Sequence, residues 1–320
     1  MLSADGVNWL LNAVAHRNVL GLRVRVTGSN TSSPTCAASL DSTNYSTMRP
    51  VCTVAQEPAD LPPATFDSLY RYTNTPVVIR NATLSATAHF RAQTQMAALA
   101  ANYGDALVTL SSANAFSYGR KRERVRVYLD SLPLAAEAWR RAIDSDDDQA
   151  AAQTFYWFGE HSSELQSLLD LYPLPRYVRP AMRSLEPRHS SGSALGALLG
   201  LATAVAPQVR SVTLEEKGAP ALSFGVAPDQ SGVPFHFHND GFSEVLHGTK
   251  RWLFYPHRPP RFRENATSAS WLRHDYPRLP RSERPQECVV GPGDLLYFPN
   301  GWWHAIINEG DAVVFMSTFL

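Results

Sequence analysis

This sequence of 320 residues has no long apolar run, no excess of charge of either sign, and little cysteine. A transmembrane helix needs about 18 or more consecutive apolar residues. The nearest candidate, the Ala- and Gly-rich stretch 194–207, is too short, so we expect no transmembrane segment. Lys plus Arg total 29, as do Asp plus Glu. This balance argues against a chain-wide surface for nucleic acid or an anionic membrane, so partners have to be inferred from a site.

The cysteines number three, at Cys36, Cys52 and Cys288, and none stands in a C-x-x-C spacing. A structural zinc site is therefore not expected. Three cysteines do not make a disulfide framework, but they leave room for one bridge. If a bridge forms, Cys52 and Cys288 would tie the start of the folded domain to its strand-rich second half, with Cys36 left over.

The signals for the secretory pathway conflict. Asp5 stands where a signal peptide has a basic residue, and the polar residues 16–18 interrupt the apolar stretch, so the N-terminus does not match a secretion signal. N-x-S/T sequons indicate the opposite, although chance supplies several in a chain rich in Ser and Thr. The candidate glycosylation sites are Asn30, Asn44, Asn81 and Asn265.

One folded domain is expected over residues 51–320. Residues 1–50 contain a Ser/Thr/Asn-rich segment and indicate a poorly structured N-terminal extension. Residues 173–220 carry several prolines, a serine-rich loop and an Ala/Gly/Leu stretch, which indicates an insertion or loop within the domain. From residue 221 onward, short strand-like segments follow one another between Gly and Pro turns. That density predicts a β-barrel or sandwich.

Candidate metal ligands cluster in two of these strand-like segments. His236, His238 and Asp240 are two residues apart, so an extended strand would place all three on one face. A distant strand, residues 295–298, is followed by a turn and His304. Two histidines and one carboxylate are the ligand set of non-haem Fe(II) oxygenases. Taken alone, the His-x-His pair would also fit an ordinary polar turn.

Three segments resemble the JmjC (jumonji) family of 2-oxoglutarate oxygenases and occur in that family's order. Residues 232–236 are similar to its S/T-P-L-H lead-in, residues 248–252 to its G-x-K-x-W strand, and residues 292–304 to its G-D-x-L-x-x-P-x-x-W-x-H element. The resemblance covers about residues 52–320 outside the expected insertion. It implies a mainly β fold with flanking helices, a double-stranded β-helix of the jelly-roll, cupin-like type.

The resemblance also implies roles for individual residues. In the family the first and last motif histidines bind Fe(II), which implies His236 and His304 as ligands. The lysine of G-x-K pairs with the distal carboxylate of 2-oxoglutarate, which implies that role for Lys250, because a buried dicarboxylate needs a charge-assisted partner. Fe(II) and 2-oxoglutarate are thus the expected cofactors.

The sequence departs from the family pattern at two positions. His238 stands where the family has Asp or Glu, and Val233 stands where a hydroxyl helps to hold 2-oxoglutarate. Three neutral imidazoles can bind Fe(II), Zn(II) or Cu(II), but they leave the centre more positive. Asp240 would supply a carboxylate by a two-residue slip, since it shares a strand face with His236. That slip needs the strand to continue through residues 239–241, which look more like its end.

Two functions follow from these observations. The first is an Fe(II)- and 2-oxoglutarate-dependent oxygenase that hydroxylates a protein side chain in the endoplasmic reticulum lumen, and Lys250 favours it. The second is a catalytically inactive jumonji domain that acts as a regulatory protein-binding module, and the two departures favour it. A small-molecule cupin would share the fold without needing Lys250. Chromatin demethylation is least favoured, because no zinc finger or basic tail accompanies the domain, and no nucleic-acid partner is expected.

Overall fold

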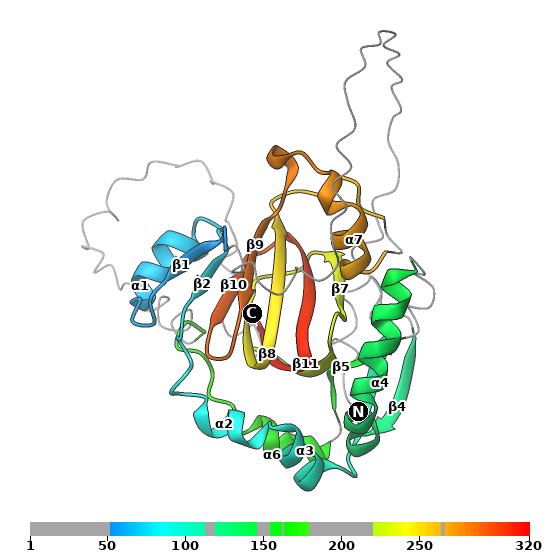
Figure 1. The fold of residues 1–320 in the computed structure, drawn as a ribbon. Helices are drawn as coiled ribbons and strands as arrows, with labels where there is room; N and C mark the ends of the chain where they lie inside the picture. The colour runs from blue at the N-terminus through cyan, green and yellow to red at the C-terminus, as the bar shows by residue number, and fades with distance from the viewer. Residues whose placement is uncertain (1–51, 113–118, 146–153, 162, 179–219, 264–265) are drawn as a thin grey trace, which may run out of the picture.

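The computed structural model describes residues 52–112, 119–145, 154–161, 163–178, 220–263 and 266–320 (Figure 1). The expected extension over residues 1–50 and most of the expected insertion over residues 173–220 lie outside these ranges. Three of the four sequons, at Asn30, Asn44 and Asn265, lie outside them as well. The structure therefore leaves those predictions untested.

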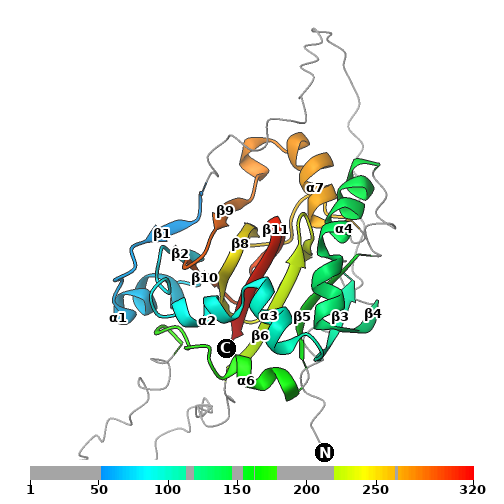
Figure 2. The same cartoon turned by 60° about the horizontal axis from the view of Figure 1, so that its bottom comes forward.

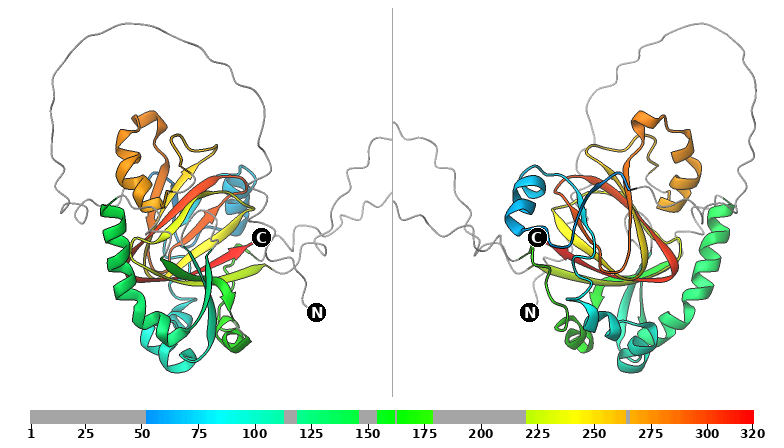
Figure 3. Two further views of the ribbon diagram at one scale, coloured as in Figure 1. Left: turned by 90° about the vertical axis from the view of Figure 1, so that its right-hand side faces the viewer. Right: turned by 60° about the vertical axis from the view of Figure 1, so that its left-hand side comes forward.

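The described residues form eleven strands of one sheet that curls around a common interior (Figure 3). The long antiparallel strands β8 and β11 lie at its centre, and β7 and β9 pair with β11 and β8 respectively. This architecture confirms the predicted mainly β, cupin-like jelly roll. The main strand order is β1 (Ala55–Glu57), β2 (Val77–Ile79), β10 (Leu295–Phe298), β8 (Gly241–Tyr255), β11 (Trp303–Phe319), β6 (Ala221–Pro228), β5 (Phe155–His161), β3 (Leu107–Ser112) and β4 (Arg120–Arg124), with β7 (Gly232–His236) and β9 (Gln286–Val290) beside it.

Helices lie at the periphery of this sheet, as Figures 1 and 2 show. No helix in the described part of the chain is long and apolar enough to cross a membrane. The α-helices are α1 (Pro63–Phe66), α2 (Ala88–Gln93), α3 (Met96–Tyr103), α4 (Val125–Asp144), α6 (Gln166–Leu169) and α7 (Ser268–His274), with shorter turns η3 (Asp67–Arg71), η4 (Ser163–Leu165), η8 (Tyr276–Arg278) and η9 (Arg281–Glu283).

The longest helix, α4, shows how the sequence attaches helices to the sheet. Its buried side chains include Tyr128, Leu132, Ala136, Trp139 and Ile143. They recur every three or four residues, so they form one apolar stripe along the helix. Burying a large apolar side chain contributes about 1.5–3 kcal/mol relative to leaving it exposed. The stripe therefore fixes α4 alongside the sheet, where it contacts β6 and β11.

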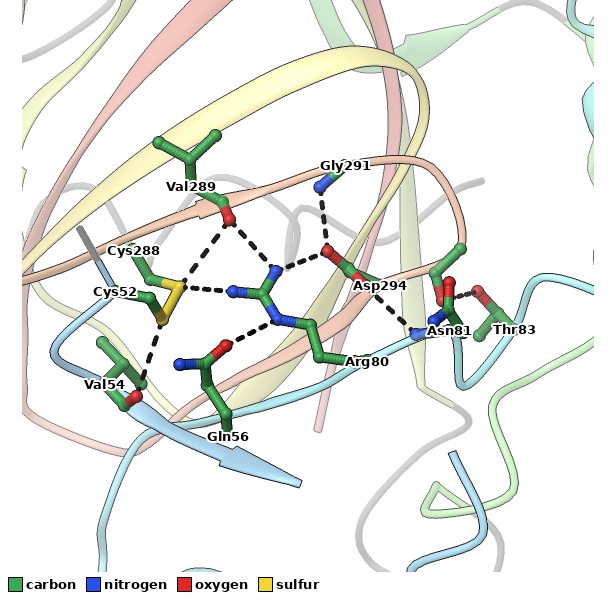
Figure 4. A network of polar contacts seen from close by, with 11 residues as sticks. Cys52, Val54, Gln56, Arg80, Asn81, Thr83, Cys288, Val289, Gly291 and Asp294 are labelled. Carbon is green, nitrogen blue, oxygen red and sulfur yellow. Dashed lines mark hydrogen bonds and ion pairs between the residues drawn. A yellow bond between two sulfur atoms is a disulfide. The ribbon is translucent and has the colours of Figure 1, made fainter. Parts of the chain in front are cut away.

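A disulfide joins the beginning of the described chain to β9. Cys52 and Cys288 are bonded Sγ to Sγ and are separated by 236 residues in the sequence. The bridge that the sequence allowed is therefore present, with Cys36 outside the described residues. Closing so long a loop removes unfolded-state entropy worth about 5 kcal/mol in the chain-entropy model. Figure 4 shows the bridge among its polar neighbours.

Candidate metal centre

Three histidines converge at one end of the curled sheet. His236 is the last residue of β7, His304 lies near the start of β11, and the two are cross-strand partners. His238 lies in the loop between β7 and β8. One possible ligand nitrogen from each of the three lies within 4.8 Å of the others. The structure thus brings together the three histidines that the sequence singled out.

Backbone carbonyls hold each imidazole in a set orientation. The Nδ1 atoms of His236, His238 and His304 lie 2.8, 2.6 and 2.9 Å from the carbonyl oxygens of Pro234, Asn239 and Trp302. A carbonyl oxygen can only accept a hydrogen bond, so each Nδ1 carries the proton. The lone pair is then on Nε2. This is the arrangement by which metal-binding histidines are oriented in proteins.

The three imidazoles are electrically neutral at physiological pH. Burial, together with the neighbouring His238, lowers the pKa of His236 to about 3. Burial also lowers the pKa of His238 and of His304. Neutral imidazole is the form that binds metal, since the lone pair must be unprotonated. Burial therefore favours the imidazole form that binds metal at all three positions.

The Nε2 atom of His304 is the clearest sign of a missing partner. The residue is 1% exposed, and Nε2 makes no hydrogen bond to any group in the described part of the chain. Leaving a buried acceptor unpaired costs about 1–3 kcal/mol. A metal ion bound by the three Nε2 atoms would satisfy this lone pair. The residues present therefore fit a metal site.

Aromatic rings lie beside two of the three histidines. The centroid of His304 lies 5.6, 5.9 and 5.7 Å from those of Trp252, Phe254 and Phe298. The ring of His238 lies 5.1 Å from Phe298 and 5.1 Å from Phe319. Such apolar neighbours weaken dielectric screening, so a bound cation would interact strongly with its ligands.

Asp240 lies outside this cluster. β7 ends at His236, so the chain has left the strand before it reaches Asp240. Its Oδ2 accepts a hydrogen bond from the Tyr297 hydroxyl at 3.4 Å, and its backbone oxygen accepts from the Leu320 amide at 3.1 Å. The alternative carboxylate is thus held by other contacts, and the third imidazole in the cluster belongs to His238.

Lys250 is a buried cation on the inward face of the sheet. It is 2% exposed and lies opposite Asn308, whereas Phe254 lies opposite His304. Four residues of strand, about 13 Å, therefore separate its backbone from the level of the histidines. Its Nζ stands 3.1 Å from the centroid of the Phe315 ring.

No carboxylate in the described ranges forms an ion pair with Lys250, and burial alone lowers its pKa well below the usual value. Burying an ammonium group without an anion is costly. An anionic ligand inside the sheet would therefore raise the pKa of Lys250 again and pair with it.

Other unpaired polar groups share this interior and were not found from the sequence. Trp252 Nε1 and Ser243 Oγ are buried without hydrogen-bond partners in the described structure. Asn308 Nδ2 donates to the Ser231 carbonyl and hydroxyl, which leaves its Oδ1 buried and unpaired. Val233 is half-buried and offers no hydroxyl. Only the strand register reveals these groups, because nothing in their local sequence marks them.

Asn81 is the one candidate glycosylation site that the structure describes. Its side chain is exposed, its φ is 55°, and its backbone amide donates to Asp294 Oδ1. The Thr83 hydroxyl of the same sequon is buried and donates to Glu244 at 2.7 Å. The exposed side-chain amide of Asn81 leaves room for a glycan on the folded surface.

The fold and this site define a class of protein. The cupin-like domain family matches residues 63–319 of the chain. The chain belongs to this family, as a cupin-like JmjC-domain protein.

The chain is also similar to individual proteins of known name. JmjC domain-containing protein 8 of Homo sapiens is 37% identical over 271 residues, which cover 84% of each chain.

Shorter segments of the chain match proteins whose names describe oxygenase chemistry. A Caenorhabditis briggsae protein, named bifunctional arginine demethylase and lysyl-hydroxylase, is 32% identical over 113 residues, 30% of this chain and 28% of its own length. A 2-oxoglutarate and iron-dependent oxygenase of Gallus gallus is 30% identical over 100 residues, 28% and 24% of the two chains. The JmjC domain is thus related to iron- and 2-oxoglutarate-dependent demethylases and hydroxylases.

Proposed function

We propose that this chain is an Fe(II)- and 2-oxoglutarate-dependent oxygenase of the protein hydroxylase type. Its metal is held by the Nε2 atoms of His236, His238 and His304. The observation that carries the proposal is the buried, unpaired Nε2 of His304 beside two further imidazoles whose Nδ1 protons are fixed by carbonyl oxygens.

Lys250 provides the second half of the argument. A bound Fe(II) supplies the redox chemistry by which O2 is activated while 2-oxoglutarate is decarboxylated. Lys250 binds the distal carboxylate of that co-substrate, since it is the buried cation on the same inward face as His304 and has no carboxylate partner among the described residues. The Trp252 ring lies 5.8 Å from Lys250 Nζ and 5.6 Å from the His304 ring, so this cation and the histidines flank the same indole ring.

The regulatory alternative rests on the two departures from the family pattern. Three neutral imidazoles bring no negative charge, so an iron ion would keep its full positive charge and would be harder to oxidise. Val233 also removes a hydroxyl contact to the co-substrate. Both features favour a catalytically inactive JmjC domain that acts as a regulatory protein-binding module, and this is the second candidate function.

The proposed location is the endoplasmic reticulum lumen. The Cys52–Cys288 disulfide supports it, because disulfides form and persist in oxidising compartments. The exposed Asn81 sequon also supports it. The proposed substrate is a side chain of another protein, as the names of the demethylase and hydroxylase relatives suggest for those proteins.

Metal content and 2-oxoglutarate decarboxylation of the purified full-length chain test both functions together. We expect one Fe(II) per chain and metal-dependent decarboxylation in the wild type. His304→Ala should lose both, whereas the exposed His257→Ala should lose neither. Lys250→Met should keep the metal and lose turnover, with the exposed Lys121→Met as its control. Stoichiometric metal without any turnover, or no metal in folded wild type, would refute the oxygenase and favour the binding module.

A further inference from the structure

The disulfide between Cys52 and Cys288 has an arginine as its closest polar neighbour (Figure 4). The Nη2 atom of Arg80 lies 3.1 Å from Cys288 Sγ and can donate to it. Arg80 directly follows β2 in the sequence, 208 residues from Cys288. The contact is therefore made by the fold and does not follow from chain proximity.

Arg80 is held in place by its other contacts. Its Nη1 donates to Asp294 Oδ2 at 2.6 Å and to the Val289 carbonyl at 3.1 Å, and its Nε donates to Gln56 Oε1 at 2.9 Å. Asp294 in turn accepts from the backbone amides of Asn81 and Gly291 at 3.1 Å each. The guanidinium group thus faces the sulfur without having to move.

A guanidinium donor suits a thiolate much better than a disulfide. A disulfide sulfur is neutral and accepts hydrogen bonds weakly, whereas a thiolate carries a full negative charge and forms charge-assisted hydrogen bonds. A neighbouring Arg lowers the pKa of a cysteine thiol. A thiol of lower pKa is also a better leaving group in thiol–disulfide exchange. Arg80 is therefore placed to stabilise Cys288 when the bridge opens.

The two sulfurs differ in access from solvent. Cys288 is 0% exposed, whereas Cys52 is half-buried at the start of the described domain. An incoming thiolate therefore reaches Cys52 more easily than Cys288. We propose that Cys52–Cys288 is a thiol-exchange site, attacked at Cys52 Sγ and releasing Cys288 as a thiolate held by Arg80. This proposal does not depend on the proposed oxygenase function.

The exchange is balanced in atoms and electrons. An external thiolate, from a small-molecule thiol or a protein cysteine, forms a bond to Cys52 Sγ while the bond between Cys52 and Cys288 breaks. The electron pair of the broken bond stays on Cys288 Sγ, so the external sulfur is oxidised and Cys288 is reduced. A second thiolate can then displace the adduct from Cys52, which leaves a dithiol and an external disulfide.

Opening the bridge places a new charge close to the candidate metal centre. Cys288 on β9 is the cross-strand partner of Trp252 on β8. Directly opposite residues point to the same face of a sheet, and the Trp252 ring lies 5.6 Å from the His304 ring. Trp252 is thus a neighbour of the exchange site on the sheet and of His304 in the histidine cluster.

Trapping the mixed disulfide in the folded full-length chain tests the proposal. Cys36→Ser removes the third thiol, and the protein is incubated with reduced glutathione in one arm and, in the other, with a reduced thioredoxin variant that lacks its second, resolving cysteine. Alkylation with N-ethylmaleimide followed by peptide mass spectrometry then locates each group. We expect the adduct on Cys52 and the alkyl group on Cys288. A reaction in the glutathione arm alone identifies small thiols as the partners, and a reaction with thioredoxin adds protein thiols. No reaction in either arm, or an adduct on Cys288, would overturn the proposal.

Two variants with opposite expected effects separate this role from a structural one. Arg80→Met should slow exchange by about 3- to 10-fold, because the leaving thiolate loses its cation. Asp294→Asn removes the competing anion from Arg80 and should speed exchange. Arg80→Lys keeps the positive charge and should lie between wild type and Arg80→Met, which keeps the test usable if Arg80→Met does not fold. If Arg80 only holds the structure together, both Arg80→Met and Asp294→Asn would loosen the region and speed exchange, and that result would refute the assignment.

Discussion

Replacing Lys250 should separate stability from co-substrate binding. Lys250 is buried, unpaired with any carboxylate in the described chain, and has its pKa lowered by burial. Burial of the Lys250 amine therefore destabilises the folded state, because the same amine is protonated and hydrated in the unfolded chain. Methionine has a similar length and no charge, and the surroundings already contain the Phe315 and Trp252 rings. Lys250→Met should stabilise the ligand-free protein and weaken its binding of 2-oxoglutarate.

The size of the effect follows from burial. Placing a polar group in an apolar site without a partner costs about 1–3 kcal/mol in mutational data, so Lys250→Met should raise the free energy of unfolding by about that amount at neutral pH. Losing a charge-assisted hydrogen bond worth about 1.5–3 kcal/mol should weaken 2-oxoglutarate binding by about 10- to 100-fold. The same substitution should thus increase stability and decrease the affinity for 2-oxoglutarate.

The dependence on pH gives this prediction a defined sign. The unfolded state binds more protons than the folded state between the lowered pKa of Lys250 and its unfolded value of about 10.4, so wild-type stability rises with pH across that window. Lys250→Met lacks this slope. Its advantage over wild type, measured by urea denaturation at several pH values, should therefore shrink as the pH approaches 10. A variant less stable than wild type at neutral pH, or one that binds 2-oxoglutarate as tightly as wild type by calorimetry, would refute the reasoning.

Three further predictions follow from other sites. The lowered pKa of His236, about 3, means that metal binding should persist on acidification well below pH 6, whereas ordinary histidines would release metal near pH 6.5; equilibrium dialysis at pH 5 and pH 7.5 checks this. Glu244 is fully buried and accepts hydrogen bonds from three hydroxyl groups, so Glu244→Gln should lower the free energy of unfolding by about 1.5–3 kcal/mol, measured by urea denaturation against the exposed Glu137→Gln. Gly248 has a φ of 74°, and a Cβ there would lie 2.9 Å from the Ala312 carbonyl oxygen, so Gly248→Ala should lower the free energy of unfolding by about 1–2 kcal/mol. Gly301 has a φ of 75° but lies in open space, so Gly301→Ala should lower it less. Thermal melts of the two variants check this difference.

The histidine cluster was largely predictable because its signal is local. His236 and His238 stand two residues apart, and His304 follows a motif of fixed spacing, so the strand pattern and the family resemblance together identified all three. The sequence also indicated that the strand ends near residues 239–241, and the structure ends β7 at His236. That early end explains why Asp240 lies outside the cluster.

The contacts that join distant parts of the chain were not predictable. Arg80 meets Cys288 across 208 residues, and Thr83 meets Glu244 across 161 residues. Such contacts depend on strand order and on register, and a shift of one residue would turn every side chain of a strand to the other face. Hydrophobic periodicity indicates that strands exist, but it does not say which of them become neighbours. The unpaired groups inside the sheet, such as Asn308 Oδ1, were missed for the same reason.

Iron K-edge X-ray absorption of the chain reconstituted with Fe(II) under anaerobic conditions tests the central claim most directly. Three imidazole ligands from His236, His238 and His304 should appear in the wild type, and His238→Asp should show two imidazoles and one carboxylate. Fewer than three imidazoles in the wild type, or a carboxylate ligand that disappears in Asp240→Asn, would contradict the three-histidine metal centre.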